Sequence, residues 1–570
     1  MTLRTSWGAP RQRTELGLGD LVILLGILAL IYLGVLVGRG APASVTGPAL
    51  TLAPQALPYY AALSLARMVG AYLLSLAFAL VYGYVAAHSR PARQGLLPLL
   101  DVLQSVPILS FLPVAVLSLS AILPEGAAVE LSSILLIFTS QVWNMAFSTY
   151  QSFSTVPGDL CEASAAFGLH PWLRLRLVEL PFAARSLVWN SMMSWAGGWF
   201  FLIAAETFTL GARDFRLPGL GSYLQAAAQA DDRPAVAWGL AALVLTILTV
   251  DQVVWRPALT WSERFRLQMV TGREEAHSWL YDVVSRAYLV QWFLERVWRP
   301  LSEGLDRTIV RLRPARPKGQ GAARRPWLAW VALAAVSLAL AYAAFLALRA
   351  LSRLPAPAWI TILVGLGATA LRVAAALAIG ALWAIPAGVL IGTNRRVASV
   401  AEPVVQVIAS IPATALFPII VVALISLPGG QNLAAILLML LGTQWYILFN
   451  VIAGTVAIPQ ELYDMSDMLR LGSRLRWTTL ILPALFPYLV TGLVTASGGA
   501  WNASIVAEYV VVGGQPFQIA GVGALIAAAT ENGDLVLLLA ATLSLIVAVV
   551  AVNRVLWRRL YERATEQYRF

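Results

Sequence analysis

Four ionisable residues lie within or at the ends of long apolar stretches, where a charge is costly and therefore points to a function. They are Arg67, Glu206, Arg372 and Glu508. An arginine there could draw an anion inwards, or it could reach the interface or brace a loop, which we favour. A carboxylate there could contact a partner protein or gate a path, but an ion pair with an arginine is the simpler interpretation.

Polar and aromatic side chains deeper in the apolar stretches suggest a second role, which is to line a path for a solute. Hydrogen bonding between helices explains such residues equally well. The set consists of Gln141, Trp143, Asn144, Asn190, Gln444, Trp445, Asn450 and Asn502.

Prolines interrupt two of the apolar stretches at related places. Pro107 and Pro113 lie in one stretch, and Pro412 and Pro418 lie in the other. A proline bends a helix and frees a backbone carbonyl. Such breaks are tolerated at membrane depth only where they lie beside protein or line a cavity. These four prolines are therefore our candidates for the constriction of a path.

The segments around these prolines, Ser105–Pro113 and Ser410–Pro418, are predicted to approach a central path and to narrow it. The constriction would be mostly apolar, and an apolar constriction blocks ions by dewetting. The residues expected to form this gate are Ile108, Leu109, Ala413 and Thr414.

Other residue types that commonly carry chemistry are sparse. Cys161 is the single cysteine, so no disulfide can form within the chain, and the three histidines are far apart and predict no metal site. The phosphate-binding pattern G-x-x-x-x-G-K-[ST] does not occur, and the single lysine is Lys318. The chain is therefore expected to hold no cofactor and not to be an ATPase or another enzyme.

The composition predicts the elements that must position these residues. The chain has 570 residues, is 59% hydrophobic and 12% charged, and has a mean hydropathy of +0.74. No water-soluble fold hides so much apolar surface, whereas helices of about 20 apolar residues span a bilayer. We predict an all-α polytopic membrane protein with about twelve spans, the first of them retained. They lie near 21–38, 62–87, 97–121, 130–153, 182–205, 235–254, 326–349, 360–391, 405–427, 432–457, 484–505 and 533–553.

The net charge of +11 reflects the orientation of the chain in the membrane and does not indicate binding to nucleic acid. Arginines gather in alternate loops and are fewer in the loops between them. By the positive-inside rule, both termini and the central linker are predicted to be cytoplasmic.

The sequence contains two similar halves. From Pro157 to Arg256 the first half aligns with the second at an offset of 302 residues, and earlier positions such as Arg67 and Arg372 align at 305. An even number of spans per repeat gives both the same orientation, about a pseudo-twofold axis along the membrane normal. The predicted domains are 1–260, a linker at 261–325, and 326–570. The aromatic and basic linker is interpreted as an interfacial helix followed by a flexible tether, with a regulatory domain as the alternative.

A segment rich in prolines and small residues, "TVPGDLCEASAAFGLHPWLRLRLVELP", separates two predicted spans. Pro157 suits the first turn of a helix, and Gly168 can end it in a left-handed cap. The alanines make one side of that helix small, so another protein can approach it closely, and Glu162 offers a charge. The segment "AIPQELYDMSDMLRLGSRLRWTTLILP" recurs in the second half. We interpret both segments as docking elements rather than simple connections.

"EASAAFG" followed by "LP" resembles the EAA loop of ABC importer permeases. The segments "SVPILSFLP" and "SIPATALFP", and the later "PGLG" and "AGVG", resemble the nitrate/sulfonate/taurine/bicarbonate branch of that family. The resemblance implies a coupling helix that docks on an ATP-binding subunit. The second copy departs from the pattern, with Asp464 in place of the Glu, Arg470 in place of the Gly, and Gly472 two residues late. The resemblance assigns coupling to Pro157, Glu162, Ala163, Gly168, Pro181, Pro459, Asp464, Gly472 and Pro483.

The resemblance implies a fused permease of an ATP-driven importer in a bacterial inner membrane. Its partners would be two cytoplasmic ATP-binding subunits, which hold ATP and Mg, an extracytoplasmic solute-binding protein, and membrane lipid. Nucleic acid would not be a partner, and the solute would be small and often anionic. The alternatives are a major-facilitator-like secondary transporter with six plus six helices, and a channel or scaffold without energy coupling.

Overall fold

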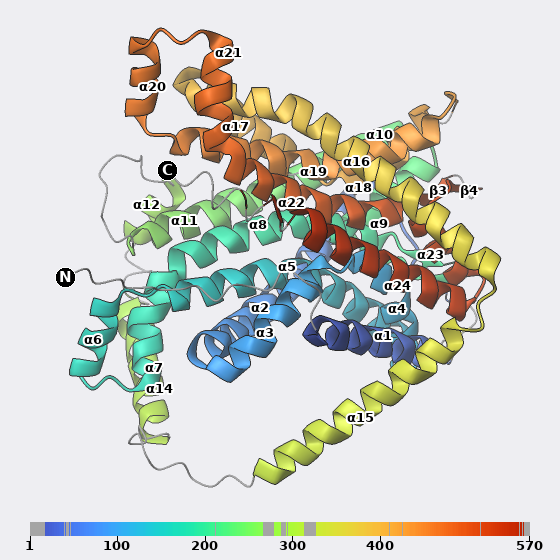
Figure 1. The fold of residues 1–570 in the computed structure, drawn as a ribbon, viewed down its shortest axis with the longest axis horizontal. Coiled ribbons are helices and arrows are strands. Elements are labelled where there is room, and N and C mark those ends of the chain that lie inside the picture. Colours follow the sequence, from blue (N-terminus) through green and yellow to red (C-terminus); the bar gives the residue numbers. More distant parts are fainter. Residues whose placement is uncertain are drawn as a thin grey trace.

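The chain folds into a bundle of long helices with shorter elements at both ends (Figure 1). The computed structural model describes residues 18–38, 40, 45, 47–210, 213–265, 279–286, 292, 294–312, 326–409, 411–424, 426–512, 515–557, 559–560 and 563. The main helices of the first half are α1 (Leu18–Gly38), α2 (Leu57–His88), α3 (Arg90–Ser105), α4 (Leu112–Ser120), α5 (Glu125–Ser154), α8 (Leu180–Glu206) and α10 (Arg233–Val250). Those of the second half are α15 (Pro326–Leu351), α16 (Ala356–Thr393), α17 (Arg395–Ala409), α18 (Ala413–Leu424), α19 (Gly430–Ala457), α22 (Leu482–Ala507) and α24 (Leu535–Val552).

Several helices have the length and composition of membrane spans, which agrees with the predicted polytopic all-α class. Among the described residues, seven qualify: Pro54–His88, Gly126–Ser154, Arg233–Glu263, Ala356–Thr393, Gly430–Ala457, Ser473–Ala507 and Leu535–Trp557. Shorter apolar helices run over Val22–Gly38, Ile108–Ser120, Ser337–Leu351 and Val522–Glu531.

The third predicted span of each half, 97–121 and 405–427, is not one continuous helix. In the first half a 3-10 turn at Ile108–Phe111 separates α3 from α4, and in the second half α17 ends before α18 begins. Pro107 and Pro412 lie at these two breaks. A proline has no N–H to donate to the helix, and Pro107 has the extended ψ of 113°. The predicted interruption of these spans at their prolines is therefore present in the structure.

Short elements cover the two ends of the bundle. At one end lie two hairpins, β1 (Thr209–Leu210) with β2 (Arg213–Asp214) and β3 (Tyr509–Val512) with β4 (Gln515–Gln518). Each is followed by a helix, α9 (Leu220–Gln229) or α23 (Val522–Glu531), and the sequence analysis predicted neither the hairpins nor these helices. Two helical loops project from the other end (Figure 1): α6 (Gly158–Ala166) with α7 (Pro171–Arg174), and α20 (Gln460–Met468) with α21 (Ser473–Arg476).

The described part of the linker consists of short helices. They are α11 (Arg256–Glu263), α12 (Trp279–Arg286) and α14 (Arg299–Leu312). The predicted basic tether at 313–325 lies outside the described residues. Amphipathic spacing of apolar and charged residues explains why these segments form surface helices rather than spans.

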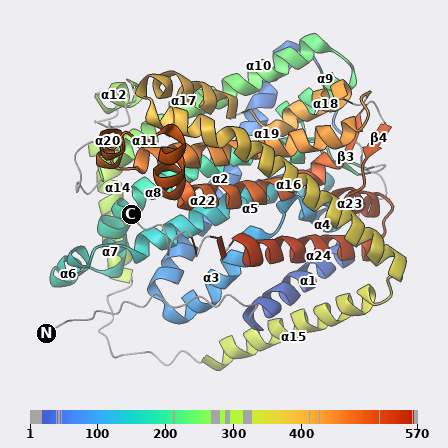
Figure 2. The same ribbon diagram turned by 45° about the horizontal axis from the view of Figure 1, so that its top comes forward.

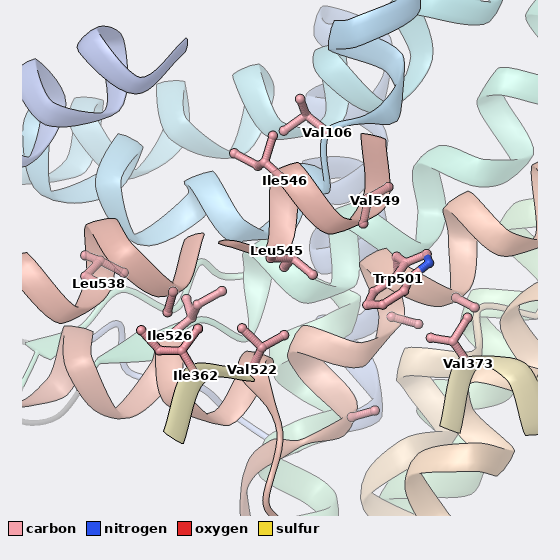
Figure 3. Close-up of a cluster of buried hydrophobic side chains, with 14 of the residues drawn as sticks. Val106, Ile362, Val373, Trp501, Val522, Ile526, Leu538, Leu545, Ile546 and Val549 are labelled. Carbon is pink, nitrogen blue, oxygen red and sulfur yellow. The ribbon is translucent and has the colours of Figure 1, made fainter. Parts of the chain in front are cut away.

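The two halves share hydrophobic cores rather than packing as separate bundles. Figure 3 shows Val106, from the break of the first half, beside Ile546 of α24, inside a core built otherwise largely from the second half. Reciprocally, Ala415 of α18 is part of the core of the first half. Helix α1 lies between α15 and α24 of the second half (Figure 2), and its Leu28 and Ile31 are buried there.

Candidate functional site

The proline-containing breaks meet the opposite half of the molecule. The Oδ1 of Asn502 on α22 accepts hydrogen bonds from the backbone N–H groups of Ile108 and Leu109. Because the break leaves these N–H groups without helical partners, the asparagine replaces the missing bonds. On the other side, the hydroxyl of Thr414 donates to the backbone oxygen of Phe200 on α8. Each break therefore packs on the fifth predicted span of the other half.

The predicted gate residues are closely packed in this structure. Leu109, Ala413 and Thr414 are buried, and Ile108 is partly buried. Pro107, Pro113 and Pro412 are also buried, whereas Ser410 and the side chain of Pro418 lie outside the described part of the chain. The breaks therefore form a closely packed contact between the halves in this structure.

Arg67 and Glu206 form a buried ion pair near the hairpin end of the first half. The guanidinium donates to Glu206 at 2.8 Å, and it also reaches Glu130 at 2.7 Å and the backbone oxygen of Pro218 at 2.9 Å. Glu206 additionally accepts from the hydroxyl of Ser64 at 2.6 Å. The arginine thus braces the loop before α9, and both charges are neutralised where they are withdrawn from water.

The second half repeats this arrangement. Arg372 donates to Glu508 at 2.8 Å and to the backbone oxygen of Ala520 at 2.7 Å, and Thr369 donates to Glu508 at 2.7 Å. One partner differs: Asn432 accepts from Arg372 where Glu130 accepts from Arg67. The first cluster therefore carries one more carboxylate than the second.

The sequence analysis identified the four charged residues of these clusters but missed the residues around them. Ser64 and Thr369 were findable, because both carry hydroxyls and align at the same offset of 305 as the arginines. Glu130 and Asn432 were harder to find, because they lie close to the point where the offset changes.

Glycines allow the loops to approach these carboxylates. The backbone N–H of Gly221 donates to Glu206 and that of Gly523 donates to Glu508, both at 2.8 Å. A Cβ added at Gly219 would lie 2.3 Å from the carboxyl carbon of Glu206, and one at Gly521 would lie 2.2 Å from that of Glu508. Only a residue without a side chain fits between helix and loop at these points.

The deeper polar residues mostly bond to neighbouring helices. Gln444 accepts from the indole N–H of Trp383 at 3.0 Å, and Asn190 donates to the hydroxyl of Ser148 at 3.0 Å. Trp143 lies edge-on against Phe78, and Trp445 against Trp383. Gln141 is buried, and Asn144 donates to Ser194 and Asn450 to the backbone of its own helix. These contacts support helix packing in the present conformation.

The first projecting loop has the expected helix and cap, with two differences. Pro157 immediately precedes α6 instead of lying in its first turn, and Gly168 has the left-handed φ of +59°. The segment from Pro171 does not separate the loop from the next predicted span, because it continues through a π-turn at Leu175–Glu179 into α8. Pro181 lies in the first turn of α8 and cannot donate an N–H, which accounts for the shifted hydrogen bonding of the π-turn.

The second loop has the same shape despite its different residues. Pro459 precedes α20, Pro483 follows a second π-turn, and Gly472 precedes α21 with an ordinary φ of −60°. Arg470 occupies the left-handed position itself, at φ +48°. The gap-free alignment was therefore the right register, and the later glycine does not replace Gly168.

The outward faces of the two loops differ in bulk. Glu162 and Ala163 are exposed on α6, and their counterparts Asp464 and Met465 are exposed on α20. Ser164 and Ser466 are buried in both loops and hold them in the same way, each donating to a carbonyl three residues earlier. The first loop thus offers a flatter surface than the second.

Charged groups at the base of the first loop connect it to two helices. Glu179 on the π-turn accepts from Arg174 at 2.9 Å and contacts the ring of His88 at the end of α2 at 3.0 Å. The corresponding positions of Glu179 and His88 in the second half are Ile481 and Thr393. This polar junction therefore belongs to the first half.

Comparison with known proteins gives one family and several relatives. The family described as "Binding-protein-dependent transport system inner membrane component" matches residues 79–254 and 384–564, more than half of the chain. The bicarbonate transport system permease protein CmpB of Synechococcus elongatus is 35% identical over 152 residues, 27% of this chain and 51% of that protein. The nitrate import permease protein NrtB of a Synechocystis species is 31% identical over 142 residues, 25% of this chain and 50% of that protein.

A relative with lower sequence identity has a different solute in its name. The putative aliphatic sulfonates transport permease protein SsuC of Bacillus subtilis is 26% identical over 137 residues, 24% of this chain and 48% of that protein. The chain spans about half the length of the curated relatives that it matches. The family match occurs twice, once in each repeat.

Proposed function

Because this chain belongs to the family of binding-protein-dependent transport system inner membrane components, we propose that it is the transmembrane subunit of an ATP-driven importer, with two permease units fused in one polypeptide. A solute-binding protein would deliver the solute at the hairpin end, and two ATP-binding subunits would dock on the loops at the other end. The loop end would face the cytoplasm of a bacterium, as the distribution of arginines predicts.

One observation carries this proposal. The two docking loops have the same fold, α6–α7 and α20–α21, and both project from one end of the molecule at corresponding places in the repeats (Figure 1). Two matching docking sites on the same side suit a pair of ATP-binding subunits that close on each other. A secondary transporter of the major-facilitator type needs no such sites, because an ion gradient drives it.

The proposed mechanism is alternating access along the interface of the halves. Closure of the ATP-binding subunits would move the two loops, and each loop continues through a π-turn into α8 or α22. These are the two helices that carry Phe200 and Asn502, the partners of the breaks in the opposite half. Movement of a loop would thus be transmitted to the constriction, and the separation of the halves would open it.

The proposed solute is a small anion. The names of the matched relatives carry bicarbonate, nitrate and aliphatic sulfonates, all of which are small and negatively charged. In the present conformation Arg67 and Arg372 are engaged with carboxylates. Anion binding would therefore rely on backbone and polar groups that become accessible when the halves separate, or on the binding protein.

The proposal is tested by purifying the tagged chain from its native membrane in mild detergent. We expect an ATP-binding subunit to co-purify, and the reconstituted complex to hydrolyse ATP faster when the loaded binding protein is added. Uptake that follows an ion gradient, with no ATP-binding subunit retained, would support the major-facilitator alternative. If no ATP-binding subunit co-purifies and uptake follows no ion gradient, the result would support a channel or scaffold.

A further inference from the structure

The linker helix α14 contacts the first docking loop. The indole N–H of Trp172 donates to Asp306 at 2.8 Å, and the guanidinium of Arg176 forms an ion pair with the same carboxylate. The guanidinium also donates to the backbone oxygen of Ser302 at 3.1 Å. Figure 1 shows α14 running beside α7 at the loop end of the molecule. A single turn of α14 therefore holds two side chains of the loop.

The contact uses the face of α14 that carries Ser302 and Asp306. Ser302 and Asp306 are four residues apart, so they lie on the same side of the helix. The side chain of Asp306 is only 16% exposed, and that of Arg176 is 31% exposed. Glu303 points elsewhere, since it is 53% exposed and pairs with Arg299 and Arg307 of its own helix. The partly buried pair is the stronger one, because exposed pairs contribute little.

The second loop has no equivalent of this contact among the described residues. Arg474 corresponds to Trp172, and Thr478 corresponds to Arg176. Both are exposed, and the hydroxyl of Thr478 donates only to carbonyls of its own helix. Arg474 could donate to a carboxylate as the indole does, but among the described residues it forms no hydrogen bond or ion pair with α14, and Thr478 carries no charge for Asp306. In the described part of the chain, α14 is therefore bonded to the first loop and not to the second.

We propose that α14 acts as a brace that fixes the first docking loop for its ATP-binding subunit, so that one docking site is held by α14 and the other is not. This inference rests on the proposed function and adds an asymmetry to it. Asp306 is a positioning residue: it holds Trp172 and Arg176, and these fix the start of the helical segment that follows α6. The linker is thereby part of the coupling apparatus rather than only a connection between the halves.

The brace is tested by capturing the docked subunit separately at each loop. Phe167 is 82% exposed at the end of α6, and its counterpart Leu469 is 64% exposed at the end of α20. In a Cys161→Ser background, Phe167→Cys and Leu469→Cys each carry benzophenone maleimide in the full complex. Illumination is expected to link the ATP-binding subunit to either position. Asp306→Ala should then lower capture at position 167 several-fold and leave capture at 469 unchanged.

Two further variants separate bracing from general damage to the fold. Glu303→Ala removes a carboxylate from the exposed face of the same helix, and it should change capture at neither position. Arg176→Asp combined with Asp306→Arg reverses the ion pair, and it should restore capture at position 167 relative to Asp306→Ala. Equal capture at 167 with and without Asp306, or equal losses at both positions, would overturn the brace while leaving the importer proposal standing. Capture at neither position in the parent complex would overturn the importer proposal, and the brace with it.

Discussion

Asn502 on α22 accepts hydrogen bonds from the backbone N–H groups of Ile108 and Leu109. A side chain of the second half thus provides the hydrogen-bond acceptor that these N–H groups lack at the helix break of the first half. The aligned residue of the first half is Phe200, which contributes only its backbone oxygen to the reciprocal contact with Thr414. The two helix breaks are therefore held by different chemistry, a side-chain amide at the first break and a hydroxyl at the second.

Asn502→Leu should weaken the closed constriction. It leaves two N–H groups without a partner, and a buried unsatisfied donor costs about 1–3 kcal/mol. We expect faster ATP hydrolysis without binding protein in reconstituted complexes. Asn450→Leu is the matched control, because Asn450 bonds only to the backbone of its own helix. Unchanged basal hydrolysis in properly assembled Asn502→Leu complexes would argue against a role for this contact in closure.

Glu206→Ala should strongly destabilise the first half. Removal of one partner of a buried ion pair costs about 3–5 kcal/mol, because the remaining charge is left uncompensated. The check is thermal unfolding in detergent, in which the loss of the protein's monodisperse peak is measured as the temperature rises. Glu130→Ala serves as the comparison, since Glu130 bonds to the same arginine but is 41% exposed. If both variants unfold at the same temperature, the burial of Glu206 is not what stabilises the cluster.

Gly219→Ala and Gly521→Ala should each disturb the loop at the hairpin end. The added Cβ would lie 2.3 Å and 2.2 Å from the carboxyl carbons of Glu206 and Glu508, so the loop must move away from the helix. We expect lower thermal stability and weaker stimulation of ATP hydrolysis by the binding protein. Gly158→Ala has nothing within 4 Å of its added Cβ and should leave stability unchanged. Wild-type stability of both glycine variants would contradict the close approach.

Ala163→Arg should uncouple the first docking loop. Ala163 is exposed on α6, and a long charged side chain would separate this flat surface from a docked subunit. The expected result is the loss of transport and of stimulated ATP hydrolysis at normal expression. Met465→Arg on α20 is the paired change, and it should be tolerated better because a bulky side chain already occupies that position. Transport at the wild-type rate by Ala163→Arg would remove α6 from the coupling surface.

The membrane class, the repeats and the helix and cap of the first projecting loop were predictable because they depend on local patterns. Apolar length predicts spans, and a glycine or proline at a fixed spacing predicts a cap or a break. Even so, Arg470 takes the left-handed conformation that sequence reasoning reserves for glycine or asparagine, because the surrounding loop fixes the turn. The repeat was the better guide at that position.

What was not predictable depends on contacts between distant parts of the chain. Nothing near Asp306 indicates that it meets Trp172 and Arg176, and nothing near Asn502 indicates that its partners lie in the other half. The short hairpins were missed because strands of two to four residues leave no periodic signal. The aligned pairs Ser64 with Thr369 and Arg67 with Arg372 show how a duplicated chain provides an internal comparison for buried polar residues.

The position of α1 between α15 and α24 has a consequence for biosynthesis. Helix α1 leaves the ribosome about 300 residues before α15 and about 500 residues before α24. Until then Leu28 and Ile31 face lipid or an insertion factor instead of the helices that finally bury them. The outer layer of the first half therefore closes only when synthesis of the second half is nearly complete. Translation of the two halves as separate chains would turn this late folding step into an encounter between two molecules in the membrane, with a rate that depends on their abundance.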